Sequence, residues 1–335
     1  MYKRQSIPNQ ATHNGKTYQV TTIDDRAFEG KEQLTSVHIS NSIDSIGDYA
    51  FCGCPLLTQV SLGEGVTYMG NDIFRGSGLT SITITRNVSQ IGIAPFSACT
   101  QLTEINVDEA NPYFSSLDGV LTDKNRTTIV AYPAGKGKRY IIPDGITKIG
   151  THSFFACPIT YIHTPNSVKT IELFAFASCT DLDTIILGNS VDSIEGAAFR
   201  INDRLKTIYS MNPIPPAAHP EAFSSFSPMF FIQCTLHVPV GSLQAYKNAE
   251  VWKNFKNIVE NDFTGIERPS PDKAKIFGNK NSIAFRNIEP GTDISIYDTT
   301  GKCIKTFAVD GDSEIPLPSG IYLIKYAGRT IKIIL

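Results

Sequence analysis

One pattern of apolar and polar positions recurs along most of the first 210 residues. It is clearest in residues 43–65, IDSIGDYAFCGCPLLTQVSLGEG, which hold an Ile-Gly step, an Ala-Phe pair, a Cys, a Leu and an alternating Val-x-Leu run. The most regular marker is the Phe of the pair, at Phe28, Phe51, Phe74, Phe96, Phe154, Phe176, Phe199 and Phe223. Its intervals are 22 to 24 residues except for one of 58, which is one repeat plus an insertion of about 35. A fixed period of this length predicts a solenoid of stacked repeats.

The alternating run of each repeat predicts a short strand, at residues 36–39, 59–62, 81–84, 104–107 and 184–187. Val, Ile and Leu on one side would be buried, and the alternate positions would point outward. No repeat can bury its own apolar face, so the strands must stack into one parallel sheet, with the Phe filling the space behind it. In the Ile-Gly step, glycine would give the backbone the freedom to turn.

Both ends of a solenoid need caps, and the sequence offers a candidate for each. The N-terminal cap is predicted to be a hairpin at Asn14-Gly15, a strong two-residue turn signal. At the other end, residues 235–239 predict a last strand, and Gly241-Ser242 offers a cap to a helix at 243–248. Trp252, with Phe255 and Ile258, is expected to fill the apolar end.

The insertion, at about residues 111–144, predicts a hairpin followed by the basic loop GKGKR at residues 135–139. The loop lacks the GxxxxGK[ST] spacing and the following helix of a phosphate-binding loop. We interpret it as a solvated turn.

Composition and charge narrow the functional classes. The chain has 335 residues, is 41% apolar and carries a formal net charge of −2. This balance gives no general attraction to nucleic acid, and no apolar run is long enough for a transmembrane helix. The first residues, MYKRQSIPNQATHNG, have no apolar core segment and do not form a signal peptide. Mature secreted chains commonly lack their leader, so this does not indicate the cytoplasm.

The seven cysteines are an odd number and cannot all pair within the chain. Four of them occupy the same position of the repeat: Cys54, Cys99, Cys157 and Cys179. We interpret them as buried thiols that act as small apolar side chains. The alternative, a disulfide or metal site, lacks a CxxC pair, and Cys52 and Cys54 are too close for ordinary bridging geometry.

These motifs together resemble the BspA-type leucine-rich repeat family, found in surface proteins of Bacteroidetes and some protozoa. The repeat, the insertion NPYFSSLDGVLTDKNRTTIVAYPAGKGKRYIIPDG and the cap TLHVPVGSLQAYKNAEVWKNFKNIVE carry the resemblance over about residues 15–260. It implies an α/β repeat solenoid, a right-handed leucine-rich-repeat superhelix of short parallel strands with helical turns. It also implies secretion and a role in binding or adhesion, with no shared catalytic residues.

The tail is expected to be a separate domain. We place the solenoid at residues 1–262 and a small β-sandwich at 263–335, joined by a Pro-rich and charged linker at 265–272. The run ISIYDTTGKCIKTF…LPSGIYLIKYAGRTIKIIL resembles the C-terminal sorting domain of Bacteroidetes secretion. That domain usually begins with a Pro-Asn-Pro-like motif, and this chain has only Pro269-Ser270-Pro271 nearby.

No catalytic constellation is evident, so we predict that the chain is not an enzyme and binds no cofactor and no metal. The six histidines form no HExxH motif, and GxSxG and GxGxxG are absent. The cluster at residues 310–314, DGDSE, lacks EF-hand spacing and is interpreted as a solvated turn. Asn87 and Asn125 lie in glycosylation sequons, which matter only in a host that uses them.

The outward positions of the strands are the informative ones for function. In the later repeats they place Tyr161, His163, Ile186 and Tyr209 on the sheet face, and we predict that these four residues form an amphipathic ligand-binding patch. Aromatic side chains with a polar group are enriched at interfaces. The alternative is that the four residues pack against the insertion or against their neighbours on the sheet.

The leading hypothesis is a secreted or cell-surface binding protein, an adhesin that engages an extracellular protein or glycan and is a monomer. Two alternatives are a structural spacer with no ligand of its own and a surface glycan hydrolase. A hydrolase would need carboxylates or histidines converging in a cleft beside the insertion.

Overall fold

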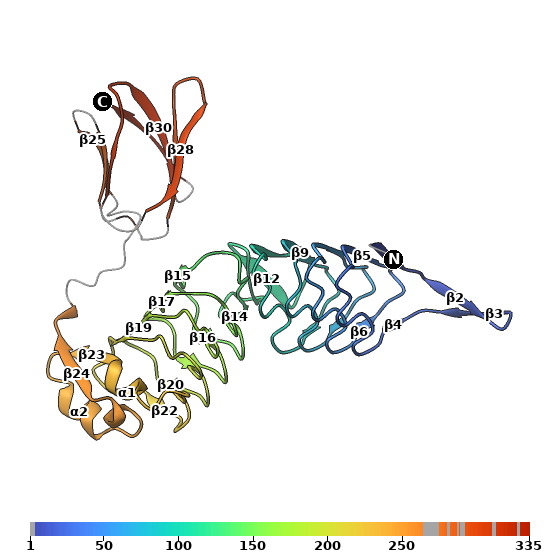
Figure 1. The fold of residues 1–335 in the computed structure, drawn as a ribbon, viewed down its shortest axis with the longest axis horizontal. Coiled ribbons are helices and arrows are strands. Elements are labelled where there is room, and N and C mark those ends of the chain that lie inside the picture. The colour runs from blue at the N-terminus through green and yellow to red at the C-terminus, as the bar shows by residue number, and fades with distance from the viewer. Residues whose placement is uncertain are drawn as a thin grey trace. The chain divides into compact units, whose positions relative to one another are not determined.

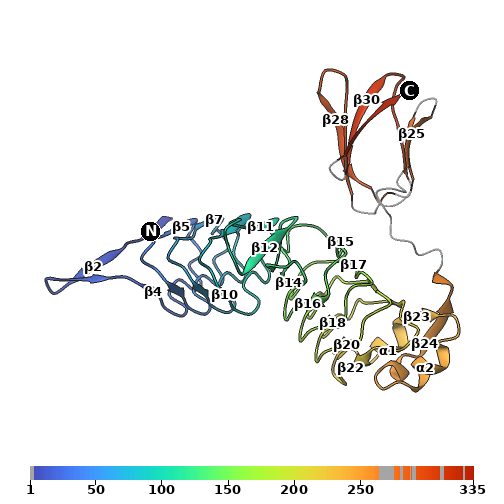
Figure 2. The same cartoon turned by 180° about the vertical axis from the view of Figure 1, so that it is seen from behind.

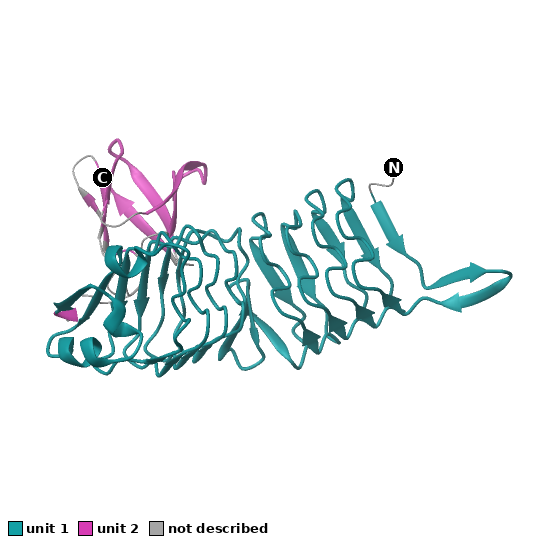
Figure 3. Cartoon of the chain, turned by 60° about the horizontal axis from the view of Figure 1, so that its bottom comes forward, with its two compact units in different colours: residues 1–261 teal, residues 262–335 magenta. Residues whose placement is uncertain are grey.

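The computed structural model describes residues 4–263, 275–279, 282–286, 288, 292–309, 313–326 and 329–335. The chain divides into two compact units, Met1–Asn261 and Asp262–Leu335, which are described separately (Figure 3). The first unit is a β-solenoid of about ten turns with very little helix. The predicted solenoid is confirmed. The proposed linker at 265–272 and residues 310–312 of the acidic cluster lie outside the described residues.

Successive solenoid turns contribute strands of three to five residues to one face, which we call the long-strand face (Figure 1). Its strands are β1 (Arg4–Ile7), β5 (Ser36–Ile39), β7 (Gln59–Ser61), β9 (Ser81–Ile84), β11 (Glu104–Val107), β15 (Arg139–Ile141), β17 (Tyr161–His163), β19 (Thr184–Leu187), β21 (Thr207–Ser210), β23 (Thr235–Pro239) and β24 (Asn257–Asn261). They pair in parallel in three groups, β1-β5-β7, β9-β11 and β15-β17-β19-β21-β23-β24. The sheet is therefore parallel, as predicted, but interrupted.

The second face, which we call the short-strand face, is built mainly from two-residue strands (Figure 2). Its strands are β4 (Thr22–Ile23), β6 (Ser45–Ile46), β8 (Tyr68–Met69), β10 (Gln90–Ile91), β12 (Phe114–Leu117), β13 (Val120–Asp123), β14 (Thr128–Ala131), β16 (Lys148–Ile149), β18 (Thr170–Ile171), β20 (Ser193–Ile194) and β22 (Ala217–Ala218). The insertion supplies the antiparallel strands β12-β13-β14, and β14 then pairs in parallel with β16. This confirms the predicted hairpin and shows how the insertion rejoins the stack.

The repeated phenylalanines stack face to face between the two faces. Neighbouring ring centroids are 5.1 Å apart for Phe28 and Phe51 and 5.5 Å apart for Phe51 and Phe74. In the inserted turn Tyr132 takes the position of the phenylalanine and stacks on Phe154 at 4.9 Å. The buried side chains form two clusters, one spanning residues 7–131 and the other 120–255, so the insertion divides the solenoid core.

The described repeats contain no helical turn around their phenylalanines, contrary to expectation, and the class is a β-solenoid rather than α/β. The segment around seven of the eight repeat phenylalanines, all except Phe223, has a left-handed residue two positions before and two after the ring, as at Tyr49 (φ 57°) and Gly53 (φ 67°) around Phe51. The N–H groups of these three residues donate to carbonyls of the next repeat at 2.8–2.9 Å. An α-helix would direct these donors along its own axis to the residue four positions earlier. Here they join neighbouring turns.

The glycine of the Ile-Gly step is required by space rather than by backbone freedom. A Cβ on Gly47 would lie 2.3 Å from Oδ1 of Asp25. That carboxylate oxygen accepts the Asp48 N–H at 2.7 Å and so links two turns. In later repeats the step becomes Ile-Glu, and Glu172 Oε2 accepts the Thr151 N–H at 3.0 Å. Both versions satisfy a backbone donor with a carboxylate from an adjacent turn.

The N-terminal hairpin forms as predicted but does not cap the core. Strands β2 (Gln10–His13) and β3 (Lys16–Gln19) pair in antiparallel register around Asn14 and Gly15, both with positive φ. All eight strand residues are exposed, and the hairpin projects from the end of the solenoid (Figure 1). A hairpin that packs on nothing covers no apolar surface, so the capping prediction is wrong.

The C-terminal cap buries Trp252, as predicted. Among the described residues, helices occur only here: α1 (Phe230–Gln233), α2 (Leu243–Asn248) and the 3₁₀ helix η1 (Trp252–Asn254). Trp252 is fully buried and its Nε1–H donates to the Pro216 carbonyl at 2.7 Å. Ser242 makes no side-chain cap, contrary to expectation. Glu260 Oε1 accepts the Leu243 N–H instead, at 3.0 Å.

The second unit consists of two antiparallel sheets. They contain β25 (Lys275–Asn279), β26 (Ser282–Arg286) and β29 (Ser313–Pro316) in one, and β27 (Asp293–Tyr297), β28 (Cys303–Ala308), β30 (Ile321–Tyr326) and β31 (Arg329–Ile334) in the other. Buried residues of both sheets, among them Phe285, Ile294 and Ile324, belong to one apolar cluster. The alternation of buried and exposed residues in β30 explains why the sequence run IYLIKY forms a strand.

Candidate functional site

The long-strand face aligns the four predicted patch residues as expected. Tyr161 lies opposite Thr184, and His163 lies opposite Ile186, which in turn lies opposite Tyr209. Tyr161 and Tyr209 are partly buried, whereas His163 and Ile186 are only 4% and 6% exposed. For His163 and Ile186 this burial favours the alternative that they pack against their neighbours on the sheet.

Side-chain size accounts for the difference between the two halves of this face. In the early repeats the outward residues are small or polar, and Ser61, Ser81 and Thr83 are exposed. In the later repeats, consecutive bonded strands place bulky residues beside one another along one row: Ile141, His163, Ile186, Tyr209, His237 and Val259. Each interior member of the row has a large neighbour on both adjacent strands, so the row packs on itself.

Arg139 adds a positive charge to the beginning of this region. Its guanidinium carbon lies 4.1 Å from the centre of the Tyr161 ring, a cation–π contact. Arg139 is the last residue of the basic loop that the sequence suggested was a solvated turn. The structure instead draws it into β15, where its register partner is Tyr161.

His237 extends the row and was missed from the sequence. Its ring stacks on Tyr209 with centroids 4.5 Å apart and an interplanar angle of 19°. Its Nδ1 forms a hydrogen bond with the side-chain oxygen of Asn261. Residues 235–239 were already predicted to form a strand. Extending the outward row of side chains into that strand identifies His237. Tyr209, His237 and Asn261 thus form a connected aromatic and polar group.

The repeated cysteines are structural, and they do more than fill space. The Cys99 thiol donates to the Phe74 carbonyl at 3.0 Å, and the Cys179 thiol donates to the Phe154 carbonyl at 3.0 Å. In the next repeat Asn202 takes the cysteine position and donates to the Phe176 carbonyl at 2.9 Å. A small buried donor at this position therefore satisfies a carbonyl of the preceding turn. This confirms the interpretation as buried thiols; none of the seven cysteines forms a disulfide.

The described residues show no constellation for metal chemistry. Within the ranges given above, no group of three or more His, Cys, Asp or Glu side chains is placed to hold a metal ion. None of the helices in those ranges has the length and apolar character needed to cross a membrane.

The solved structures to which this chain is similar include three bacterial proteins. The pneumococcal vaccine antigen PcpA is 18% identical, with 78% of this chain and 89% of that chain covered and a TM-score of 0.49. A leucine-rich cell surface protein from Faecalibacterium prausnitzii is 20% identical, with 79% and 89% covered and a TM-score of 0.41. A leucine-rich repeat protein from Bacteroides capillosus is 32% identical over 32% of this chain and 78% of that one, with a TM-score of 0.30.

Family membership rests on the sequence match rather than on these structures. No curated protein matches the chain. A model of the BspA-type leucine-rich repeat region matches six copies, over residues 21–117 and 134–237. The two ranges cover more than half of the 335 residues and include the repeats that form the stacked turns. The chain belongs to the BspA-type leucine-rich repeat family.

Proposed function

We propose that this chain is a secreted or cell-surface binding protein, an adhesin that engages an extracellular protein or a glycan through the long-strand face. Its contact region would be the later half of that face, where Tyr161, His163, Ile186 and Tyr209 lie together. Membership in a family of bacterial surface proteins carries the binding role. The chain acts as a monomer and performs no catalysis in this account.

The composition of the outward rows supports this location. The later repeats bring Arg139, Tyr161, Tyr209 and His237 onto one face through bonded strands. Tyrosine and arginine are enriched at the centres of protein interfaces because they combine large contact area with hydrogen-bonding groups. Since His163 and Ile186 are largely buried, they would support the row from within while Tyr161 and Tyr209 touch the ligand.

Binding of the full chain to immobilised plasma fibronectin, type I collagen and a printed glycan array tests the proposal. We expect at least one saturable interaction, which a Tyr161→Glu, Tyr209→Glu double variant loses. The matched control is Ser36→Glu, His38→Glu, which places the same charges in the same two rows of an early repeat. If no interaction is found, the alternative of a structural spacer without a ligand is favoured. If both variants bind equally well, the ligand does not bind at the later half of the long-strand face.

We also propose that residues 263–335 form a β-sandwich that acts as a sorting domain of the Bacteroidetes type. The two antiparallel sheets with one shared apolar cluster support the sandwich. The role is tested by deleting these residues in the source bacterium and labelling intact cells with an antibody to the solenoid. Loss of surface labelling with normal protein levels is expected, and unchanged labelling would contradict it.

A further inference from the structure

The long-strand face contains a break between β7 and β9. These neighbouring strands share no ladder pairing, although β5 pairs with β7 on one side and β11 with β9 on the other. Just before the strands, the Thr58 N–H donates to the Thr35 carbonyl at 3.1 Å and the Thr103 N–H donates to the Thr80 carbonyl at 3.0 Å. In this part of the described solenoid, no corresponding bond joins Thr80 to Thr58.

The break is confined to one face of the solenoid. On the short-strand face, β8 pairs with both β6 and β10 across the same turns. Around the phenylalanines, the Tyr49 N–H donates to the Asn71 carbonyl at 2.9 Å and the Phe51 N–H to the Ile73 carbonyl at 2.9 Å. The two turns are therefore joined on two sides, whereas on the third the strands β7 and β9 share no ladder pairing. Before and after these strands, the Gly78 N–H donates to the Cys54 carbonyl at 3.3 Å and the Thr85 hydroxyl donates to the Gly63 carbonyl at 3.5 Å.

The segment that leads into β9 is one residue shorter than the segment that leads into β7. Gln59, which begins β7, follows Phe51 by eight positions, whereas Ser81, which begins β9, follows Phe74 by seven. The shorter segment passes close to the preceding turn: a Cβ on Gly78 would lie 2.2 Å from the Pro55 carbonyl oxygen. The chain thus reaches β9 one residue earlier than the preceding turn reaches β7. The same spacing of seven separates Phe154 from Tyr161, where β17 pairs on both sides, so the shorter segment does not by itself account for the break.

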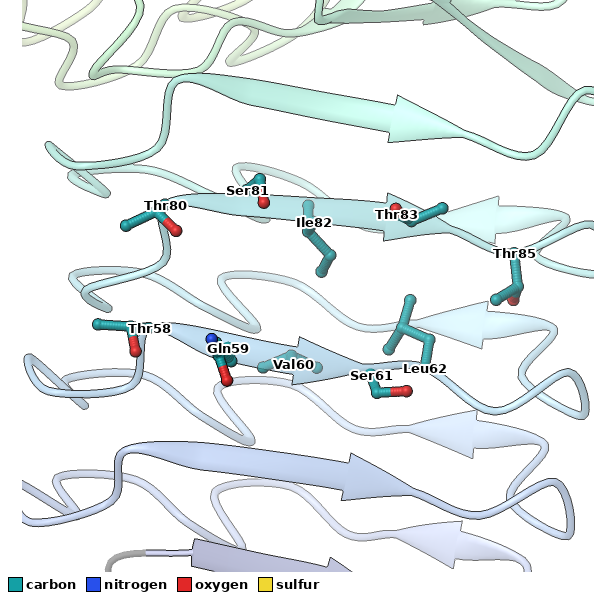
Figure 4. Close-up of a pocket in the computed structure, with 10 residues that line it drawn as sticks. All are labelled: Thr58, Gln59, Val60, Ser61, Leu62, Thr80, Ser81, Ile82, Thr83 and Thr85. Carbon is teal, nitrogen blue, oxygen red and sulfur yellow. The ribbon is translucent and has the colours of Figure 1, made fainter.

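The break forms an elongated groove, which we call the β7–β9 groove (Figure 4). It has a volume of about 320 Å³ and is lined by Thr58, Gln59, Val60, Ser61, Leu62, Thr80, Ser81, Ile82, Thr83 and Thr85. Val60 at its floor is partly buried, whereas its counterparts Val37 and Ile82 are 3% and 2% exposed. No lining residue carries a charge.

We propose that the β7–β9 groove accepts an extended, uncharged peptide segment that adds a strand between β7 and β9. Two facing strand edges present backbone donors and acceptors at the spacing of a β-ladder, and another extended backbone is the ligand that matches both edges. Five consecutive residues of the β7 side line the groove, which corresponds to roughly 16 Å of extended chain. The groove therefore suits a peptide of about five residues.

The side chains favour the same class of ligand. Val60, Leu62 and Ile82 offer an apolar floor for one row of a strand, and the hydroxyls of Ser61, Ser81 and Thr83 border the other. A neutral oligosaccharide would use the hydroxyls but leave the two backbone edges unmatched. No aromatic residue lines the groove for a sugar ring to stack on. An inserted strand needs β7 and β9 to move apart to about twice the ordinary 4.8 Å spacing.

The test uses the full chain and a synthetic peptide, acetyl-TSITIT-amide, which copies residues 80–85. A natural strand of this solenoid is a suitable probe because it already fits beside such strands. Hydrogen exchange of the backbone amides, read by NMR or mass spectrometry, is followed in residues 57–63 and 79–85. We expect about tenfold slower exchange there with saturating peptide. The same peptide N-methylated at both isoleucines keeps its side chains and should have no effect.

A variant of the chain provides a second, independent test. Insertion of one alanine between Gly78 and Leu79 lengthens the segment that leads into β9, should change the alignment of β9 with β7 and should abolish the response to the peptide. The control inserts one alanine between Arg86 and Asn87, which lengthens the same repeat beyond the strand. If the first insertion unfolds the solenoid, the proposal is tested by comparing the TSITIT peptide with its N-methylated form on the unaltered chain.

Three results would overturn the proposal. They are no response to TSITIT, an equal response to the N-methylated peptide, and protection of these amides by cellotriose but not by peptide. Because the groove lies apart from Tyr161 and Tyr209, the double variant at those tyrosines should retain the peptide response. The two proposals therefore fail separately.

Discussion

The thiol of Cys99 donates a hydrogen bond to the carbonyl oxygen of Phe74, 3.0 Å away in the preceding turn. Cys99 is fully buried, and its sulfur also lies 3.3 Å from the Ser77 hydroxyl. The same relationship recurs with Cys179 and Phe154. A residue that looks like a small apolar filler in the sequence is thus a donor between turns.

Replacement of Cys99 by alanine should destabilise the solenoid, because the Phe74 carbonyl loses its buried side-chain donor. The Phe74 carbonyl still accepts the Ser77 N–H at 2.9 Å, so the expected loss is that of one hydrogen bond, about 0.5–1.5 kcal/mol. Urea unfolding followed by circular dichroism measures the change. The control is Cys303→Ala, at an exposed position of the second unit, which should alter stability by less than about 0.5 kcal/mol. Equal effects of the two substitutions would show that the thiol donor contributes nothing.

Gly47→Ala should destabilise more than Gly30→Ala. The new Cβ at position 47 would lie 2.3 Å from Asp25 Oδ1 and 2.6 Å from the Asp25 backbone nitrogen, so two turns must separate. Overpacking of this kind costs about 1–3 kcal/mol. Gly30 has a positive φ but open space around it, so alanine there adds only a local backbone penalty of about 1 kcal/mol. The free energies of unfolding of the two variants decide between these causes.

Alkaline pH should weaken the fold. Burial raises the pKa of the Cys179 and Cys234 thiols from 9.0 to about 12 and that of the Tyr246 hydroxyl from 10.0 to about 12. A pKa raised on folding favours the protonated native state. Its contribution is fully present below the unfolded pKa and is lost as pH rises towards 12.

The free energy of unfolding should therefore fall between pH 9 and pH 12 in urea titrations under reducing conditions. A Cys179→Val variant lacks one of these groups and should show a smaller fall over the same range. A flat profile for the unaltered chain, or an identical slope for the variant, would contradict the assignment.

Trp252→Phe should loosen the C-terminal cap. The Trp252 Nε1–H donates to the Pro216 carbonyl, and phenylalanine cannot replace that buried donor. We expect a loss of about 1–3 kcal/mol in the free energy of unfolding. Val240→Ala, at a site that is 69% exposed, is the control and should change stability by less than about 0.5 kcal/mol. A neutral Trp252→Phe substitution would mean that packing alone closes this end.

Periodicity predicted the stack correctly because burial imposes it. Phe51, Phe74 and Phe96 recur at a regular spacing because their rings stack on one another in successive turns. Trp252 could be predicted as part of the cap because it is a large apolar side chain beyond the last repeat. The helical turns were wrongly expected because residues such as Tyr49 and Phe174 adopt left-handed backbone through bonds to the next turn. Residue type alone carries no such signal. The right-handed sense of the superhelix stays a prediction.

Nonlocal contacts account for the other differences. Glu260 lies 18 residues beyond Ser242 in the sequence, yet it supplies the cap that Ser242 was expected to provide. His163 is buried because strand pairing places it beside Ile141 and Ile186, and the sequence of its own repeat does not reveal these neighbours. The β7–β9 groove lacks a specific sequence signal, because the change from eight to seven positions after the phenylalanine recurs between Phe154 and Tyr161, where β17 pairs on both sides. A one-residue change in spacing does not by itself show which strands lose their pairing.

The central claim is that the later half of the long-strand face binds an extracellular ligand. Its most direct test is the surface-plasmon-resonance affinity of the unaltered chain and of the Tyr161→Glu, Tyr209→Glu variant for a ligand that binds on the arrays. We predict a loss of at least about tenfold for this variant, with no change for Ser36→Glu, His38→Glu. Unchanged affinity of the tyrosine variant, with loss in the early-repeat variant, would contradict the account.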